Sequence, residues 1–209
     1  MKISTSMGAL VVALGLTSAA NAAINVSIYY NQQGAASNAT IAQAASLGAA
    51  NGTTTVNAIN FNSNDSTTSN IGTFLGNPAG LNALTAAHTL NNTYFLFTGQ
   101  TFLNAGANSF VVPHDDGLEL AIAGIGTVLS QPGPTAAVNS PFTVNAPSAG
   151  LYNFTLAYGE TAGGPAVLRF NVNGSPGGVP EPASWALLMT GFGMVGFAMR
   201  RRATDVVTA

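Results

Sequence analysis

The sequence has no cysteine, so disulfide bonds do not stabilise this chain. Charge is also scarce: Asp, Glu, Lys and Arg make up 6% of 209 residues, and Arg169 is the one basic residue between residues 23 and 179. This scarcity excludes nucleic acid as a partner, because phosphate binding needs a basic surface. Stability must therefore come from a buried core or a bound metal. The surface must be built from Asn, Ser, Thr, Gln and Gly, which also suit hydrogen bonds to sugar hydroxyls.

The first 22 residues have the pattern of a secretory signal peptide. Lys2 precedes an apolar core at 8–16, and Ala20 and Ala22 form an A-x-A cleavage site. This core is too short to span a bilayer as a membrane helix. We therefore expect residues 1–22 to be removed after export through the Sec translocon. About 158 residues remain up to Pro180, which is enough for one domain with a real core.

A second apolar run lies near the C-terminus. Residues 183–199 carry no charge, and as a helix they would rise about 25 Å, slightly less than the ~30 Å hydrocarbon core of a bilayer. Pro180 and Pro182 prevent a helix from starting earlier, and Trp185 lies where an interfacial indole belongs. Arginines follow the run, and arginine stays on the cytoplasmic side. The sequence therefore predicts a transmembrane helix with the preceding domain outside.

The order of features in this tail is specific. A Pro-Glu-Pro triplet, a Trp-Ala pair, a short apolar helix and a basic end resemble the PEP-CTERM sorting tail of Gram-negative bacteria, in its PEPxxWA variant. The residues that carry the resemblance are Pro180, Glu181, Pro182, Trp185, Ala186, Arg200, Arg201 and Arg202. An ordinary tail anchor is the alternative. Such an anchor needs only an apolar run of sufficient length and flanking charge, so it does not require the other features of this tail.

The resemblance implies how the chain is anchored, processed and delivered. The tail, residues 180–202, would anchor the protein transiently in the inner membrane, with residues 203–209 as a cytoplasmic end. An exosortase would then read the tail. The protein would be passed to the cell surface or to the exopolysaccharide matrix of a biofilm.

Between the two ends, short stretches of alternating apolar and polar residues indicate β-strands. They lie at 24–30, 54–61, 93–97, 109–112, 117–122, 142–144, 152–158 and 166–172, and the last two are predicted to form a hairpin. Short helices are expected at 40–47 and after Asn77, which is predicted as an N-cap for a helix ending near Thr89. Many short strands favour a mostly β fold, an antiparallel β-sandwich over residues 23–172, with residues 173–179 as a flexible linker.

The concentrated charge of this domain is Asp115-Asp116-Gly117, with Glu119 two residues later. Adjacent carboxylates repel each other unless a cation neutralises them, and Ca²⁺ is the hard, oxygen-seeking ion available outside cells. Arg169 is the other candidate cation. Asp and Gly also suit turns, so a solvated turn is the alternative reading of the same residues.

Three segments around this pair resemble the protective-antigen-like β-sandwich of bacterial toxins, glycosidases and fungal flocculins. They are 110–120, 151–160 and 166–170, and they supply an Asp-Asp-Gly after a strand, a Gly-x-Tyr strand ending in Tyr-x-Glu, and an alternating strand. The resemblance implies Ca²⁺ on Asp115 and Asp116, a cis peptide between them, and a sugar whose hydroxyls complete the metal shell. His114 departs from it, since a small hydroxyl residue is usual there.

We therefore expect a non-enzymatic exported surface or matrix protein, with Ca²⁺-dependent binding of extracellular polysaccharide as the sharper hypothesis. A purely structural matrix protein is one alternative, and a secreted glycoside hydrolase is the other. A hydrolase needs two carboxylates about 5 Å apart or more. Asp115 and Asp116 are adjacent, so the partner of one of them would have to be Asp65, Glu119 or Glu160.

Overall fold

The computed structural model describes residues 23–64, 68–161, 165–177, 190–191 and 193–194. The predicted signal peptide and most of the predicted sorting tail lie outside these residues. Residues 21–180 form a compact unit of their own, and the fold described below is the fold of this domain. Within the described ranges, no helix is long and apolar enough to cross a membrane.

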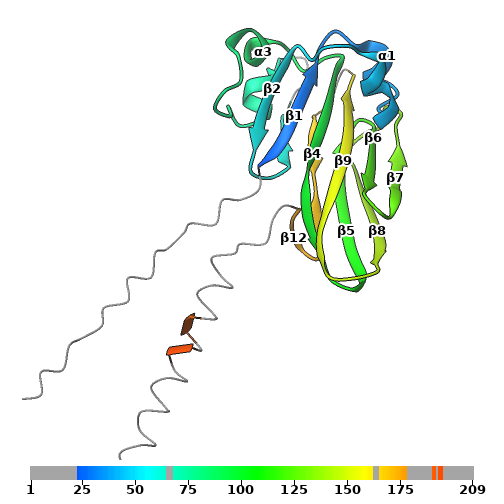
Figure 1. The fold of residues 1–209 in the computed structure, drawn as a ribbon. Coiled ribbons are helices and arrows are strands. Elements are labelled where there is room, and N and C mark those ends of the chain that lie inside the picture. The colour runs from blue at the N-terminus through cyan, green and yellow to red at the C-terminus, as the bar shows by residue number, and fades with distance from the viewer. Residues whose placement is uncertain (1–22, 65–67, 162–164, 178–189, 192, 195–209) are drawn as a thin grey trace, which may run out of the picture. The chain divides into compact units, whose positions relative to one another are not determined.

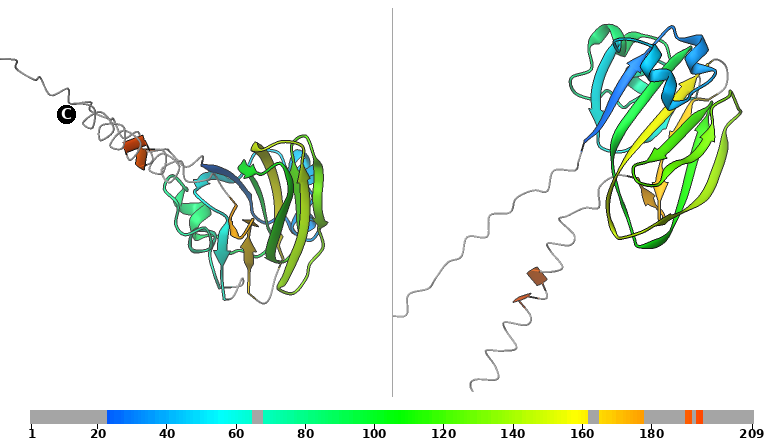
Figure 2. Two further views of the ribbon diagram at one scale, coloured as in Figure 1. Left: turned by 90° about the horizontal axis from the view of Figure 1, so that it is seen from below. Right: turned by 45° about the vertical axis from the view of Figure 1, so that its right-hand side comes forward.

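The domain is a sandwich of two antiparallel sheets (Figures 1 and 2). Sheet A has the order β2 (Gly52–Val56), β1 (Ile24–Tyr29), β4 (Thr93–Leu103), β9 (Gly150–Glu160), β6 (Leu118–Ile122) and β7 (Gly126–Gln131). Sheet B has the order β12 (Ser175–Pro176), β11 (Asn171–Val172), β5 (Gly106–Asp115), β10 (Val167–Arg169) and β3 (Asn60–Asn62), and β8 (Val138–Ala146) pairs with β5. The predicted β-sandwich is confirmed.

The alternation that predicted the strands corresponds to their buried and exposed faces. On β9, Phe154, Leu156 and Tyr158 are buried, whereas Leu151 and Asn153 are exposed. The inward residues of both sheets meet in one core rich in phenylalanine, isoleucine and leucine. Burying each such side chain contributes roughly 1.5–3 kcal/mol, which replaces the stabilisation that disulfides would give.

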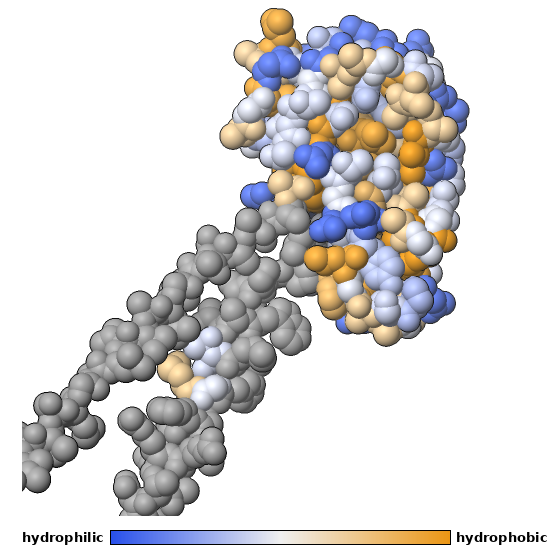
Figure 3. All heavy atoms as spheres, viewed as in Figure 1, coloured by the Kyte–Doolittle hydropathy of each residue, from blue (hydrophilic) through white to orange (hydrophobic). Residues whose placement is uncertain are grey.

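The outer surface is largely neutral. Outward positions of sheet A carry exposed side chains such as Asn25, Thr53, Thr55 and Asn153. Hydrophilic and hydrophobic residues are interspersed over the face of the domain in Figure 3. The surface thus offers hydroxyl and amide groups, as the composition predicted.

Two helices cover the outer face of sheet A at one end, where α1 (Gln33–Ala36) lies in Figure 1. Together with the 3-10 helix η1 (Ile41–Ser46), α1 packs around Tyr29, Tyr94 and Ala157. The start of β4 is therefore covered on both sides. The helix predicted at 40–47 exists, but it is a 3-10 helix.

The helix predicted from Asn77 to about Thr89 exists only in part, as α3 (Ala83–Ala87), and its predicted N-cap is wrong. Asn77 has a left-handed backbone conformation, φ 51°, that an N-cap does not adopt. Two shorter helices occupy this region, α2 (Ile71–Phe74) and α3 (Ala83–Ala87). Their N-caps are Asn70 and Asn82, whose side chains accept hydrogen bonds from the backbone of Thr73 and Thr85, respectively.

Three other predictions fail, two of them because alternation identifies a strand but not its partner. The strand expected at 54–61 is divided between β2 in sheet A and β3 in sheet B. The hairpin expected from the last long strands does not exist, because β9 pairs with β4 and β6 whereas β10 pairs with β3 and β5. The linker expected from residue 173 begins inside the domain, since β12 pairs with β11.

Candidate metal centre

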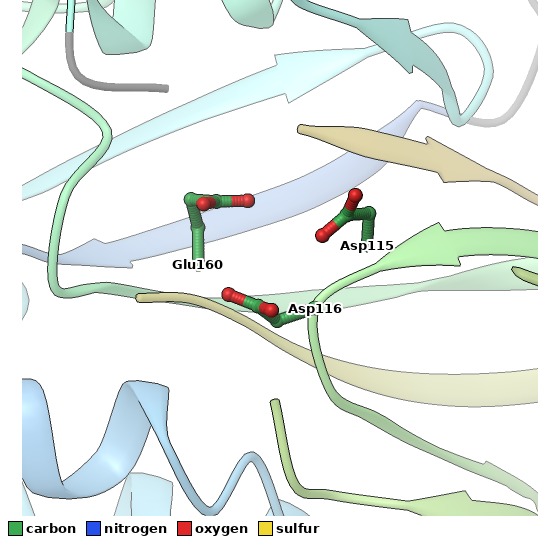
Figure 4. A group of neighbouring side chains, drawn as sticks. All are labelled: Asp115, Asp116 and Glu160. Atoms are coloured by element: carbon green, nitrogen blue, oxygen red, sulfur yellow. The ribbon is translucent and has the colours of Figure 1, made fainter. Parts of the chain in front are cut away.

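Three carboxylates meet at one end of the sandwich, and they come from both sheets. Asp115 ends β5, Asp116 follows it, and Glu160 ends β9. One carboxylate oxygen from each residue lies within 4.8 Å of the others (Figure 4). All three residues are buried, with exposed fractions of 8%, 6% and 1%, respectively. The structure therefore places acidic groups in the interior, where an unpaired charge is costly.

Asp115 and Asp116 are joined by a cis peptide bond, as the resemblance implied. Each of their backbone carbonyl groups accepts a hydrogen bond from a buried ring. The hydroxyl of Tyr158 contacts the Asp115 carbonyl oxygen and, at 2.9 Å, Oε2 of Glu160. Nδ1 of His114 lies 2.6 Å from the Asp116 carbonyl oxygen. These contacts fix the direction of the backbone at the two aspartates.

The Asp116 carboxylate is oriented by two loops. Its Oδ1 accepts a hydrogen bond of 3.1 Å from the backbone N–H of Thr135, in the loop between β7 and β8. Its Oδ2 accepts one of 2.8 Å from the backbone N–H of Thr161, and another from the hydroxyl of Thr161. Donors from outside the turn therefore hold this side chain in one orientation.

Glycine is required on both sides of the cluster. A Cβ atom at Gly117 would overlap the carbonyl oxygen of Pro132, and one at Gly159 would overlap the carbonyl oxygen of Ala36. The backbone N–H of Gly159 donates to the carbonyl oxygen of Gly117 at 2.9 Å. The close approach of these backbones explains why glycine follows the aspartates and precedes Glu160.

The cluster has no lysine or arginine to neutralise it in the part of the chain that the structure describes. Arg169 is the one lysine or arginine in that part, and it is exposed on β10, where it pairs with Asn60. The prediction that Arg169 could neutralise the aspartates is therefore wrong for the described residues. Burial, and then the charge of Asp116, raise the pKa of Asp115. Burial and the neighbouring Glu160 likewise raise the pKa of the Tyr158 hydroxyl far above its usual value.

The donor set fits a hard divalent cation. Carboxylate oxygens are the ligands that Ca²⁺ prefers, and a cation would relieve the repulsion among three buried acids. Ca²⁺ takes roughly 6–8 oxygen ligands, so these residues alone would not complete its shell. Water or the hydroxyl groups of a ligand would supply the remaining oxygens.

The other acidic residues considered in the sequence do not join the cluster. Oε2 of Glu119 accepts a hydrogen bond of 2.7 Å from the backbone N–H of Ile41, and Oε1 accepts one of 3.2 Å from Ser130. Glu119 thus attaches η1 to sheet A. Asp65 lies outside the described residues. Glu160 was considered as a possible second acid of a hydrolase, and its place in the cluster was missed, although the Tyr-x-Glu pattern marked it.

Comparison with known proteins gives matches for the C-terminal tail and for the domain. Residues 178–202 match the PEP-CTERM protein-sorting motif. The PA14 domain of the MpAFP antifreeze protein is 18% identical, with a TM-score of 0.56, and the match covers 71% of this chain and 80% of that one. A PA14 sugar-binding domain from an RTX adhesin is 23% identical, with a TM-score of 0.55, over 73% of this chain and 90% of that one. No curated protein sequence matches the chain.

These similarities establish two points. The tail is a PEP-CTERM sorting motif, which indicates an exported protein that an exosortase processes. The domain has the PA14 fold, the protective-antigen-like sandwich that the sequence predicted.

Proposed function

We propose that this chain is an exported surface or matrix protein whose domain binds neutral extracellular polysaccharide through a Ca²⁺ ion held by Asp115, Asp116 and Glu160. The observation that carries the proposal is the cluster itself: three buried acidic residues, each with a carboxylate oxygen within 4.8 Å of the others. Hydroxyl groups of a sugar are the natural oxygen ligands for the rest of the shell. One of the similar structures is a PA14 sugar-binding domain from an RTX adhesin, which agrees with this proposal.

Each residue has a defined task in this proposal. Asp115, Asp116 and Glu160 would hold the ion, which supplies the positive charge that attracts hydroxyl oxygens. Tyr158 and His114 hold the backbone carbonyl groups of the two aspartates. Thr135 and Thr161 orient the Asp116 carboxylate before any ligand arrives, so little order has to be created on binding.

The geometry does not favour a glycoside hydrolase. Such enzymes separate their two carboxylates by roughly 5–5.5 Å or 6.5–9.5 Å across an open cleft. Here all three acidic residues are buried and do not line an open cleft. Glu119, a possible second acid, is already bound to the backbone of Ile41.

The experiment that tests the proposal is a glycan array probed with the domain, residues 23–178, in Ca²⁺ and in chelator. We expect binding to neutral glycans that disappears in chelator and in an Asp116→Asn variant. Binding that persists in chelator would contradict the role of the ion. No binding in either buffer would favour a purely structural matrix protein, and release of reducing sugars would favour the hydrolase.

A further inference from the structure

His114 is a fully buried residue whose two ring nitrogens contact different parts of the domain. Nδ1 lies 2.6 Å from the Asp116 carbonyl oxygen. A carbonyl oxygen only accepts, so Nδ1 is the donor in this hydrogen bond. Nε2 lies 2.9 Å from Oε1 of Gln131 and 3.0 Å from Oγ of Ser140. One ring thus joins the acidic turn to two other strands.

Gln131 and Ser140 flank the loop between β7 and β8. Gln131 is the last residue of β7, Ser140 lies near the start of β8, and the hydroxyl of Ser140 donates to Oε1 of Gln131 at 2.8 Å. These contacts hold the two ends of the loop, residues 132–137, together. The buried ring of His114 contacts both Gln131 and Ser140 from the interior of the domain. The position of the loop therefore depends on the same ring that holds Asp116.

The loop returns directly to the acidic cluster. The backbone N–H of Thr135 donates to Oδ1 of Asp116, and the backbone of Ala137 hydrogen-bonds Asp115. The loop has the sequence Pro-Gly-Pro-Thr-Ala-Ala and carries no charge. Gly133, Pro134, Ala136 and Ala137 are exposed. A ligand bound beside the aspartates would meet this neutral, partly apolar rim.

We propose that His114 is a positioning residue that fixes the loop 132–137 to the acidic turn, and that this loop selects which neutral sugar fits beside the ion. This inference rests on the proposed function. The small hydroxyl residue that the resemblance implies at this position would be too short to reach both Asp116 and the base of the loop, whereas His114 contacts both. The uncharged loop favours neutral sugars, whose C–H faces contact proline and alanine while their hydroxyls face the ion.

Two substitutions separate the two ends of the ring. In His114→Asn, the amide nitrogen lies at the same bond distance from Cα as Nδ1, so the variant keeps a donor for the Asp116 carbonyl and loses the contacts with Gln131 and Ser140. In His114→Gln, the amide lies where Nε2 was, so this variant keeps the loop contacts and loses the Asp116 contact. A Ser140→Ala variant tests the loop contact from the β8 side.

The first readout is hydrogen exchange at the Thr135 amide in chelator without sugar, which tests the attachment of the loop alone. We expect exchange about tenfold faster in His114→Asn and Ser140→Ala, because one or two hydrogen bonds are lost. The second readout is calorimetry with Ca²⁺. We expect Ca²⁺ affinity to fall about tenfold in His114→Gln and to change little in His114→Asn. The same calorimetry with neutral sugars in Ca²⁺ should show that His114→Asn discriminates less among them.

The control is His88→Asn. His88 stacks on Tyr30 at a ring distance of 3.9 Å, and its Nδ1 contacts Thr89. This variant should match the wild type in both readouts. Unchanged Thr135 exchange in His114→Asn and Ser140→Ala would overturn the attachment of the loop. Unchanged sugar preference with faster exchange would overturn its selecting role. Absence of Ca²⁺ binding by the wild type would instead overturn the proposed function, and it would be seen before any variant is compared.

Discussion

At the scale of single residues, the glycines around the acidic cluster should tolerate no side chain. Gly159→Ala would drive a Cβ atom into the carbonyl oxygen of Ala36, and the backbone of β9 would have to move. We expect a loss of about 1–3 kcal/mol in the free energy of unfolding. Gly150→Ala is the matched control on the same strand, because open space surrounds Gly150, and it should cost less than about 0.5 kcal/mol. Equal urea denaturation midpoints for the two variants would contradict this explanation.

Asp115 should make the free energy of unfolding depend on pH, and the sign of this dependence should differ between chelator and Ca²⁺. Its pKa is raised by burial and by Asp116, so without metal the folded state binds this proton more tightly than the unfolded state. In chelator, the free energy of unfolding should therefore fall as pH rises from about 4, the ordinary pKa of Asp, through the raised pKa. In Ca²⁺ the sign should reverse, because protons compete with the ion for the carboxylate.

The test is denaturation of the wild type and of Asp115→Asn across this pH range in both buffers. The difference between the two proteins isolates Asp115 from Asp116, Glu160, Tyr158 and His114, which surround it. Parallel curves for the two proteins in chelator would show that Asp115 does not titrate differently on folding.

Sequence reasoning at this scale identified the residues that a local pattern marks. Asp115-Asp116-Gly117 was found, and so was the Tyr-x-Glu that contains Glu160. Thr135 and Thr161 were not found, because threonine is common in this chain and their contacts with Asp116 span 19 and 45 positions, respectively. No local pattern encodes contacts that form only when the two sheets meet.

At the scale of elements, Asn108 joins two turns at the end of the sandwich opposite the acidic cluster. It is fully buried, and its side chain bonds the backbone of Asn104 and Gly106 in the turn after β4. It also accepts a hydrogen bond of 2.9 Å from Asn173, in the turn between β11 and β12. We expect Asn108→Ala to cost about 1–3 kcal/mol, because the four hydrogen bonds of this buried side chain would be lost.

The control for this prediction is Asn104→Ala. Asn104 is exposed, and it meets Asn108 through its backbone, so its replacement should change stability by less than about 0.5 kcal/mol. Thermal melts of the two variants decide the matter. Similar melting temperatures would mean that Asn108 does not hold the two turns together.

The elements themselves were partly predictable. Alternation predicted strands wherever one face is buried, and β1, β4, β8 and β9 appear where expected. The pairing of strands was less accessible, because β9 and β10 follow each other in sequence but belong to different sheets. The misplaced helix has a similar cause. An Asn-Pro pair suits an N-cap, but it also suits the left-handed turn that Asn77 adopts.

At the scale of the whole molecule, the function of the chain ends was easier to predict from the sequence than the function of the domain between them. Residues 178–202 are a sorting motif whose features follow one another along the sequence, so no knowledge of the fold was needed to find it. The signal peptide, residues 1–22, was predicted in the same way and stays a prediction. The function of the domain depends on residues that only the fold brings together.

Processing at both ends is therefore expected. Protein recovered from the cell surface should begin near Ala23 and should lack Arg200, Arg201 and Arg202, because the first segment is a signal peptide and the last a sorting motif. Mass spectrometry of the surface fraction checks both ends at once. Surface protein that still carries the arginines would show that delivery does not involve removal of the tail.

The central claim is that Asp115, Asp116 and Glu160 hold Ca²⁺, and thermal melting of the domain tests it most directly. The wild type is compared with Asp115→Asn and Asp116→Asn, in chelator and in millimolar Ca²⁺. Since the ion would bind only the folded state, Ca²⁺ at 100 times its dissociation constant should add about 2.7 kcal/mol, which raises the melting temperature of the wild type by about 5–10 °C. In chelator, Asp115→Asn should melt slightly higher than the wild type, because the pKa of Asp115 is raised by burial and by Asp116. Both variants should gain little from Ca²⁺. Identical curves for all three proteins in both buffers would contradict the account.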